Sequence, residues 1–598
     1  MIISGPPLAA QTEISVPLEH PVYVLLEAAE MRALISPLPQ TRPYSRAFVR
    51  ELIGEILAGG GAISDAEIAV LEREYKRFGP AAEGGERGII HLEGASKSGT
   101  PVVFDAAPGL FFNGSGAYYF EEEAVYGGFD FWLNVRFAGD IGTRFSYLFD
   151  LGTAFLMADR GQDGLYRISY ERTGDDAYIP AWREVYAYFP FSYKSRWGGW
   201  MFKANNISAS GPTGWPNEIC AGFNETVEIS GVTADSIFRY RFGRFDRDWG
   251  SAGGKGTSLV LNQMAQPFFG AELIVSPFSW FSFSSLTGIL EYYDRVSIKD
   301  SAATSQNAFS LMMFEFSYKN VVHFNAGTSV IWPKRLELGY IFPLVDKLFY
   351  QNSVGDFDNV NIFASLKLQK SGWFSFWAQF FLDEASPEPG FFTLDRGMYA
   401  SQLGIRVRFP LLPFASFTLS YTKIEPYCYT HARLETPWNT ELMEESYTNH
   451  GYGIGYYLPP NSDEFKLRFE TLPVHDARLY AQFQLIRHGA THGSNAVDGS
   501  SYYSELPADN RNEDPRLKKF FLADGAYQWF FVFKTGGEFA LSNTPVVLFA
   551  EGGVSFLRYT NIEGNSNSGE ASSYSFVDTA EYPASTSLVL SIGVKIFR

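Results

Sequence analysis

The sequence predicts an all-β transmembrane barrel of about 18 antiparallel strands over residues 87–598, preceded by a small α-helical bundle over residues 11–86. Three observations support this fold class. Aromatic residues make up 17% of the chain, hydrophobic and polar residues alternate along most of it, and no apolar run approaches the roughly 18 residues of a membrane-spanning helix. A soluble propeller is the alternative, but no internal repeat of blade length is evident.

The N-terminal region carries helical rather than strand patterns. Residues 1–10 end in Leu8-Ala9-Ala10, which resembles the end of a secretory signal peptide, with a disordered N-terminus as the alternative. A first helix is predicted from Pro21 through Leu34, and a second from about Ser45 to Gly59. The sequence Ser64-Asp65-Ala66-Glu67 forms a capping box that predicts a third. Because about 60 residues bury little core alone, we expect this bundle to lean on the periplasmic side of the barrel.

From about Ile89 onward the apolar period changes from 3.6 to 2. Between Phe129 and Ala138 the odd positions are all apolar, whereas the even ones include Asp130, Asn134 and Arg136. The same split recurs in residues 402–409, 465–470 and 587–596. The apolar face is predicted to meet lipid, and the other face is predicted to line a polar lumen rather than a packed interior. Long connections are expected at residues 424–449, 488–523 and 560–585.

Charge and cysteine content exclude several function classes. The formal net charge of -18 and the lack of a basic run argue against a nucleic-acid partner. The two cysteines, Cys220 and Cys428, lie too far apart for a zinc motif or a disulfide framework, and whether they pair is left open. We expect no cofactor. Outer-membrane lipids are the expected partner of such a barrel, and a monomer is the expected state.

Metal and catalytic motifs are also weak. His488 and His492 have i, i+4 spacing, but flanking glycines favour a loop without metal. The acidic residues of 498–514 match no calcium-loop template and favour a solvated loop. His475-Asp476 is interpreted as part of a turn rather than as a catalytic dyad. The sequence also contains no nucleophile elbow, so we expect that the protein is not an enzyme. A membrane-embedded hydrolase is the weakest alternative.

The segment that starts at Ser236, SIFRYRFGRFDRDWGSAGGKGTSLVLNQMAQPFFGAEL, resembles the central signature of the Wzi-like capsule-assembly outer-membrane proteins. Its matching elements are Gly243-Arg244, Trp249-Gly250, Leu259-Val260-Leu261-Asn262 and Gln266-Pro267-Phe268. The resemblance continues in VPLEHPVYVLLEAAEMRALI, TRPYSRAFVRELI, GTSVIW, YIFPL and GDFDNVNIFASLKL. It implies an 18-stranded barrel with a periplasmic helical bundle in the bacterial outer membrane. It also implies a non-enzymatic, lectin-like function, in which surface polysaccharide is bound at the extracellular rim and a capsule stays attached.

Sugar binding requires aromatic faces for stacking and Asp, Asn or Arg side chains for hydroxyl groups. The residues of this segment that meet the requirement are Arg239, Arg241, Arg244, Asp246, Arg247, Trp249 and Asn262. Their positive charges could attract an acidic polysaccharide. In the alternative interpretation, inward Arg and Asp residues pair across the lumen, and Trp249 anchors a turn. A second candidate function is a diffusion porin with a helical plug, whose charged lumen sets solute selectivity.

Overall fold

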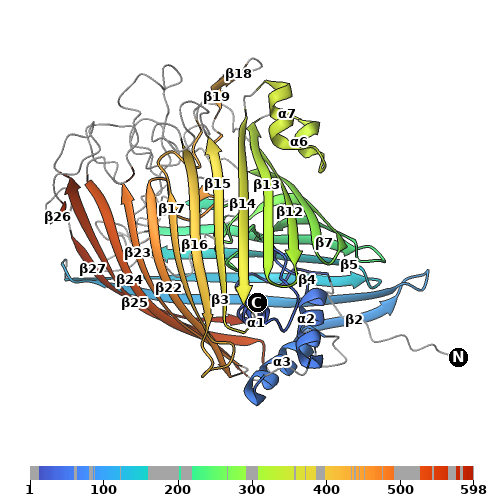
Figure 1. Cartoon of the computed structure of the whole chain (residues 1–598). Helices are drawn as coiled ribbons and strands as arrows, with labels where there is room; N and C mark the ends of the chain where they lie inside the picture. Colours follow the sequence, from blue (N-terminus) through green and yellow to red (C-terminus); the bar gives the residue numbers. More distant parts are fainter. Residues whose placement is uncertain are drawn as a thin grey trace.

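The chain folds into a closed antiparallel β-barrel with a helical bundle at one end (Figure 1). The computed structural model describes residues 13–59, 63–79, 85, 88–121, 123–158, 201–203, 218–265, 267–290, 307–333, 335–355, 358–370, 372–384, 397–431, 434–436, 439–443, 445–449, 452–474, 476–489, 521, 526–541, 544–562, 574–578 and 584–596. The predicted signal remnant at residues 1–10 lies outside this set and stays a prediction.

The three predicted N-terminal helices are confirmed as α1 (Val22–Met31), α2 (Arg46–Ala58) and α3 (Asp65–Arg77). α1 ends before Leu34 because Ala33 adopts a φ of 53°, which a right-handed helix cannot continue through. The Ser45 side chain caps α2, and the capping box of Ser64 and Glu67 is formed at α3. In the described chain, no helix is both long and apolar enough to cross a bilayer.

Eighteen strands of the described residues each pair with two neighbours and close the barrel through the pairing of β27 with β3, as the strand estimate predicts. They are β3 (Pro101–Tyr119), β4 (Ala124–Ile141), β5 (Phe145–Ala158), β7 (Glu218–Val232), β8 (Phe238–Phe245), β10 (Phe268–Phe278), β11 (Phe281–Leu290), β12 (Asn307–Tyr318), β13 (Val322–Pro333), β14 (Asn359–Lys370), β15 (Phe374–Glu384), β16 (Met398–Arg408), β17 (Ser416–Ile424), β22 (Ser462–Val474), β23 (Ala477–Gly489), β24 (Ala526–Ala540), β25 (Val546–Ile562) and β27 (Ser585–Ile596).

The remaining elements decorate this wall or lie in its connections. Strands β2 (Ile90–Ala95), β6 (Met201–Lys203) and β26 (Tyr574–Val577) pair alongside β3, β7 and β25. The connections contain β1 (Thr41–Arg42), β9 (Asp248–Trp249), β18 (Leu434–Thr436), β19 (Asn439–Met443), β20 (Thr448–Asn449), β21 (Tyr452–Gly453), α6 (Leu338–Ile341) and α7 (Lys347–Val354).

The predicted alternation is confirmed where side chains are described. In β4, Leu133 and Val135 are about half exposed on the outer face, whereas Asn134 between them is 3% exposed and faces the lumen. Leu588, Leu590 and Ile592 of β27 are exposed in the same way. Apolar side chains on the outer wall suit contact with lipid acyl chains. The pairing between strands also satisfies the backbone polar groups, as the absence of water in the bilayer requires.

The two ends of the barrel differ in their connections. At the short-turn end, strands are joined by brief turns such as residues 142–144, 279–280 and 319–321. Most connections at the opposite, long-loop end are longer, including the predicted ones that join β17 to β22, β23 to β24 and β25 to β27. His488 was expected in a loop, but it belongs to β23. Helices α2 and α3 lie at the short-turn end, opposite α6 and α7 (Figure 1).

The bundle packs against the barrel, as its small size predicts. Its apolar core includes Leu26, Ile53 and Leu71 from the three helices, together with Phe414 from the turn between β16 and β17 and Leu472 from β22. Glu67 of α3 makes a polar link across the same contact. Its carboxylate accepts hydrogen bonds from the Arg32 guanidinium at 2.6 Å and from the backbone N–H of Phe414 at 3.3 Å.

Candidate functional site

The part of the lumen nearest the short-turn end is filled by residues 13–45, which we call the N-terminal segment. All ten residues of α1 are buried. Glu30 receives a 2.5 Å hydrogen bond from the Lys367 ammonium of β14, and Glu27 lies 2.8 Å from the Arg406 guanidinium of β16. Burial works to raise the pKa of Glu30, but the Lys367 charge and its hydrogen bond outweigh burial and lower it. Inward charges of the barrel therefore hold this segment in place.

The connection between β8 and β10, residues 246–267, folds into the lumen next to this segment, and we call it the inner loop. Its strand β9 pairs with β1, so that Trp249 lies opposite Thr41. The Gly250 N–H donates to the Gln40 carbonyl at 2.9 Å. The Trp249 N–H donates to the Leu261 carbonyl at 2.8 Å, which closes the inner loop on itself. The backbone of the N-terminal segment near residue 40 is therefore hydrogen-bonded to the backbone of the inner loop near residue 250.

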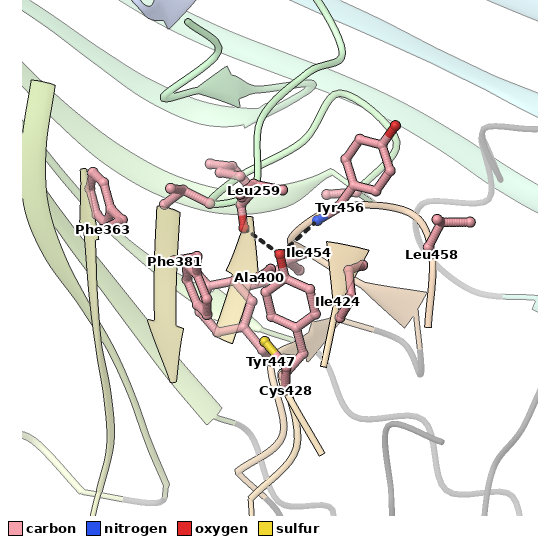
Figure 2. Packing of buried hydrophobic residues seen from close by; sticks show 14 of the residues in the cluster. Leu259, Phe363, Phe381, Ala400, Ile424, Cys428, Tyr447, Ile454, Tyr456 and Leu458 are labelled. Carbon is pink, nitrogen blue, oxygen red and sulfur yellow. Dashed lines mark hydrogen bonds between the residues drawn. The ribbon is translucent and has the colours of Figure 1, made fainter. Parts of the chain in front are cut away.

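The connection between β17 and β22, residues 425–461, is called the upper loop, and its described residues enter from the long-loop end. The Asn262 N–H of the inner loop donates to the carbonyl of Ile454 in the upper loop at 2.9 Å. The Tyr429 hydroxyl donates to the Leu259 carbonyl at 2.7 Å and accepts from the Tyr456 N–H at 3.4 Å (Figure 2). The Tyr429 and Tyr447 rings stack with centroids 5.7 Å apart. The three segments therefore form a continuous plug.

The expectation of a polar, unpacked lumen is wrong for the part that holds the two loops. Inward apolar residues of β10 to β17 and β23 to β25 join both loops in one hydrophobic cluster, part of which Figure 2 shows. The loop residues in the cluster are Trp249, Leu259, Val260, Leu261, Ala265, Cys428, Tyr429, Tyr447, Ile454, Tyr456 and Leu458. A barrel this wide cannot fill its interior with wall side chains alone, so folded-in loops supply the missing volume.

Two of the predicted sugar-binding arginines share one carboxylate. Arg241 Nε donates to Glu272 Oε2 at 2.6 Å, and Arg247 Nε donates to Glu272 Oε1 at 2.5 Å. Arg241 also donates to the Pro43 carbonyl at 2.6 Å, while the Arg247 guanidinium lies 4.0 Å from the centre of the Phe245 ring. All three charged side chains are at most 2% exposed. Glu272 therefore offsets the positive charge expected to attract an acidic polysaccharide.

The other predicted residues lie around the same loop. Arg239 Nε lies 3.6 Å from Glu13 Oε2 of the N-terminal segment. Arg244 is buried and donates to the Pro267 carbonyl at 3.2 Å, and Asp246 is half-buried. Trp249 is fully buried, so no ring face is open for stacking in this structure.

Asn262, the last predicted residue, organises the inner loop. Its Nδ2 donates to the carbonyls of Gly256 and Ser258 at 3.1 and 2.9 Å, and its Oδ1 accepts from the Met264 N–H at 3.0 Å. The structure thus brings all seven predicted residues together in and around the plug. Their contact with a glycan stays a prediction.

Sequence reasoning missed a cluster of tyrosines and a carboxylate next to the upper loop. The hydroxyls of Tyr456 and Tyr457 both donate to the Glu464 carboxylate of β22, which also accepts from Gln484 Nε2 at 2.6 Å. Tyr457 is half-buried, and the Lys466 ammonium lies 5.1 Å from the centre of its ring. The adjacent tyrosines in a long connection were the available signal, because aromatic and carboxylate groups together suit sugar binding.

The remaining sequence hypotheses fall partly outside the described residues. Within the described chain, no three His, Cys, Asp or Glu side chains gather as metal ligands would. His488 Nδ1 is hydrogen-bonded to Ser462 Oγ at 2.7 Å. His475, His492, residues 498–514 and the Cys220 side chain are outside the described set, so the pairing of Cys220 with the buried Cys428 stays open.

No protein-family model and no curated protein matches the chain. Among solved structures, it is similar to Wzi of Escherichia coli, described as a carbohydrate-binding outer-membrane β-barrel involved in group 1 capsule assembly. That match has 11% sequence identity, covers 99% of each chain and has a TM-score of 0.50.

Two Pseudomonas aeruginosa barrels, OpdL and OprD, match at 10% identity and cover 82% of this chain. The match covers 98% of the OpdL chain and 95% of the OprD chain, and the TM-scores are 0.38 and 0.37. The match to Wzi shows that the chain has the fold of an outer-membrane β-barrel. Its fold is that of Wzi, as the resemblance of its sequence signature predicts.

Proposed function

We propose that this chain is a non-enzymatic outer-membrane barrel that binds surface polysaccharide at its long-loop end. The observation that carries the proposal is the likeness of fold to Wzi, a carbohydrate-binding barrel, along 99% of both chains. The short-turn end and its helical bundle face the periplasm in this proposal, as is usual for barrels with one set of short turns. The long loops then face the extracellular polysaccharide.

The plug supports a binding barrel over a diffusion porin. A solute crossing this lumen would meet the N-terminal segment, then the inner loop and then the upper loop. These segments are joined by backbone hydrogen bonds, including Gly250 to Gln40 and Asn262 to Ile454, both at 2.9 Å. Opening a path would break those bonds and expose the apolar cluster around Leu259 and Tyr429, both at most 1% exposed.

The geometry also favours Tyr457 over Trp249 as a contact for sugar. Trp249 is fully buried, so replacing it would disrupt the plug rather than test stacking. The Tyr457 ring is partly accessible, and its hydroxyl lies on the Glu464 carboxylate. An aromatic ring beside a hydrogen-bonding acid is a suitable surface for a pyranose with its hydroxyl groups.

Polysaccharide binding can be measured with the purified full chain in proteoliposomes. The probe is fluorescently labelled polysaccharide extracted from the surface of the source cells. We expect saturable binding by the wild-type barrel and at least a tenfold weaker affinity for Tyr457→Ala. Tyr318→Ala is the matched control, because Tyr318 is 62% exposed at the short-turn end and should leave binding unchanged. Binding no greater than that of empty liposomes would refute the proposal.

A further inference from the structure

The connection between β13 and β14 forms a small helical unit on the outside of the barrel wall. It comprises α6 and α7 within residues 335–355, at the long-loop end (Figure 1). Ile331 of β13 belongs to the lumen cluster, so its neighbours Val330 and Trp332 point outward. Yet these outward side chains are at most 1% exposed, because Tyr340 of α6 and Val354 of α7 pack on them. The unit therefore covers part of the outer wall.

The unit turns its apolar side chains away from the protein. The exposed large side chains of residues 335–355 are Leu336, Leu338, Phe342, Leu344 and Phe349, which are between 58% and 78% exposed. The charged side chains of these described residues are all buried or half-buried. This arrangement is the reverse of a helix on a water-facing surface, where the apolar face packs inward.

The charged groups instead satisfy polar groups within the unit. The buried Lys347 ammonium donates to the carbonyls of Tyr340 and Phe342 at 2.6 and 3.1 Å, at the end of α6 where carbonyls have no partner within the helix. Asp346 accepts the Leu348 N–H at 3.1 Å and so caps α7. Arg335 donates to Asp358 Oδ1 at 2.7 Å. Backbone and charges are thus paired internally, as a low-dielectric surrounding requires.

We propose that the α6–α7 unit docks into the membrane leaflet at the long-loop end, with its five exposed apolar side chains among lipid acyl chains. The adjoining wall is already lipid-facing, since the outward Ile362 of β14 is 39% exposed beside the partly buried Val360 that the unit covers. β13 has twelve residues, about the length that a tilted strand needs to cross a bilayer. Its last residue, Pro333, therefore places α6 at the membrane interface.

The exposed apolar side chains favour lipid over a second protein as the group that covers them. A partner surface in water would leave the five apolar side chains exposed before assembly, whereas acyl chains cover them as soon as the barrel inserts. The exposed Asn352 and Ser353 lie one turn after Phe349 on the same face of α7. The exposed surface of that helix therefore changes from apolar to polar toward its C-terminal end. A helix that emerges from lipid toward the headgroups has this gradient.

Depth measurement with an environment-sensitive dye tests the proposal. Leu344→Cys and Phe349→Cys are each labelled in a chain that also carries Cys220→Ser and Cys428→Ala, and the barrels are placed singly in nanodiscs. Ala234→Cys is the control, because Ala234 is exposed in the turn between β7 and β8. Folding of every variant is verified by heat-modifiable gel mobility.

We expect blue-shifted emission at positions 344 and 349, with at least fivefold stronger quenching by nitroxide-labelled lipid than at position 234. Water-like emission with no lipid quenching at both positions would overturn the proposal. A blue shift that appears only when two barrels share a disc would also overturn it, in favour of a second copy as the occupant. Asn352→Cys should report an intermediate depth.

Discussion

The Tyr429 hydroxyl donates a 2.7 Å hydrogen bond to the Leu259 carbonyl across 170 positions of the sequence. The two residues belong to different connections, one entering the lumen from β8 and the other from β17. Both are at most 1% exposed, and both lie in the hydrophobic cluster inside the lumen. Together with the Asn262 to Ile454 hydrogen bond and the shared apolar packing, this bond joins the two loops into one folded unit.

Replacing Tyr429 with Phe removes this hydroxyl and keeps the ring. We expect the loss to cost about 1 kcal/mol, which is about a fivefold increase in the opening of the upper loop. Hydrogen exchange of the amides in residues 445–449 and 452–461 measures that opening. Tyr318→Phe, at an exposed position, should leave the exchange unchanged. Equal exchange in both variants would show that the two loops are not coupled through Tyr429.

Replacing Glu272 with Ala leaves Arg241 and Arg247 buried without their shared carboxylate. Because an uncompensated buried charge is costly, we expect the free energy of unfolding to fall by about 3 to 5 kcal/mol. Urea unfolding in detergent, followed by tryptophan fluorescence, measures the change. Glu93→Ala is the control, because the Glu93 side chain is 55% exposed beside His91 and its pair should contribute less than about 1 kcal/mol.

A triple variant separates charge burial from packing in the same cluster. Changing Arg241, Glu272 and Arg247 together to Met removes all three of these buried charges, so most of the stability lost in Glu272→Ala should return. A triple variant as unstable as the single one would contradict the charge explanation.

Gly254 occupies a backbone conformation that favours glycine, with a φ of 103°. A Cβ atom there would lie 2.6 Å from Glu27 Oε2 and 2.7 Å from Arg406 Nη2, which form an ion pair. We expect Gly254→Ala to cost on the order of 1 to 3 kcal/mol and to loosen the inner loop from α1. Hydrogen exchange of α1 measures this loosening. Gly94→Ala, where no atom lies within 4 Å, should leave the exchange of α1 unchanged.

Docking of the bundle should weaken in acid because of Glu67. Burial works to raise the pKa of this carboxyl, but the Ser64 N–H and the Arg32 guanidinium outweigh it and lower the pKa below its ordinary value of 4.5. A carboxyl with a lowered pKa stabilises the folded state above that ordinary value, and this stabilisation disappears as the pH falls through the folded pKa. We therefore expect hydrogen exchange of α3 to rise below about pH 4.5.

The variant Glu67→Gln isolates this carboxyl. It should exchange faster at neutral pH than the wild type and respond less to acid, since the titrating group is gone. An acid response as large as that of the wild type would show that another group controls docking.

The barrel wall was predictable because its signal is local. A strand with lipid on one side must alternate, as Leu403 and Val407 do against Gln402 and Arg406, and this pattern is independent of strand partners. The capping box at Ser64 is local in the same sense, because its two residues are three positions apart. Strand number followed from chain length divided by the length of a strand and its connection.

The plug was not predictable because its contacts are distant in sequence. Trp249 resembles an exposed sugar-stacking residue until Thr41 is known to pair opposite it. Leu259 and Ile454 are apolar residues of the kind that also occur in the wall strands, yet they lie inside the lumen. Likewise, Glu272 lies 31 positions from Arg241, and no local pattern indicates that it offsets that charge. The arginines singled out from the sequence do lie near one another, but their burial could be known only from the fold, and their contact with a glycan stays a prediction.

Single-channel recording in a planar bilayer tests most directly the central claim that this barrel is closed by a folded plug and serves to bind rather than to conduct. The wild-type chain should insert and show no steady open conductance. Gly254→Ala should show brief openings at the same protein concentration, because its inner loop is displaced from the ion pair of Glu27 and Arg406. A steady, ohmic conductance from the wild-type barrel would contradict the claim and establish a diffusion channel.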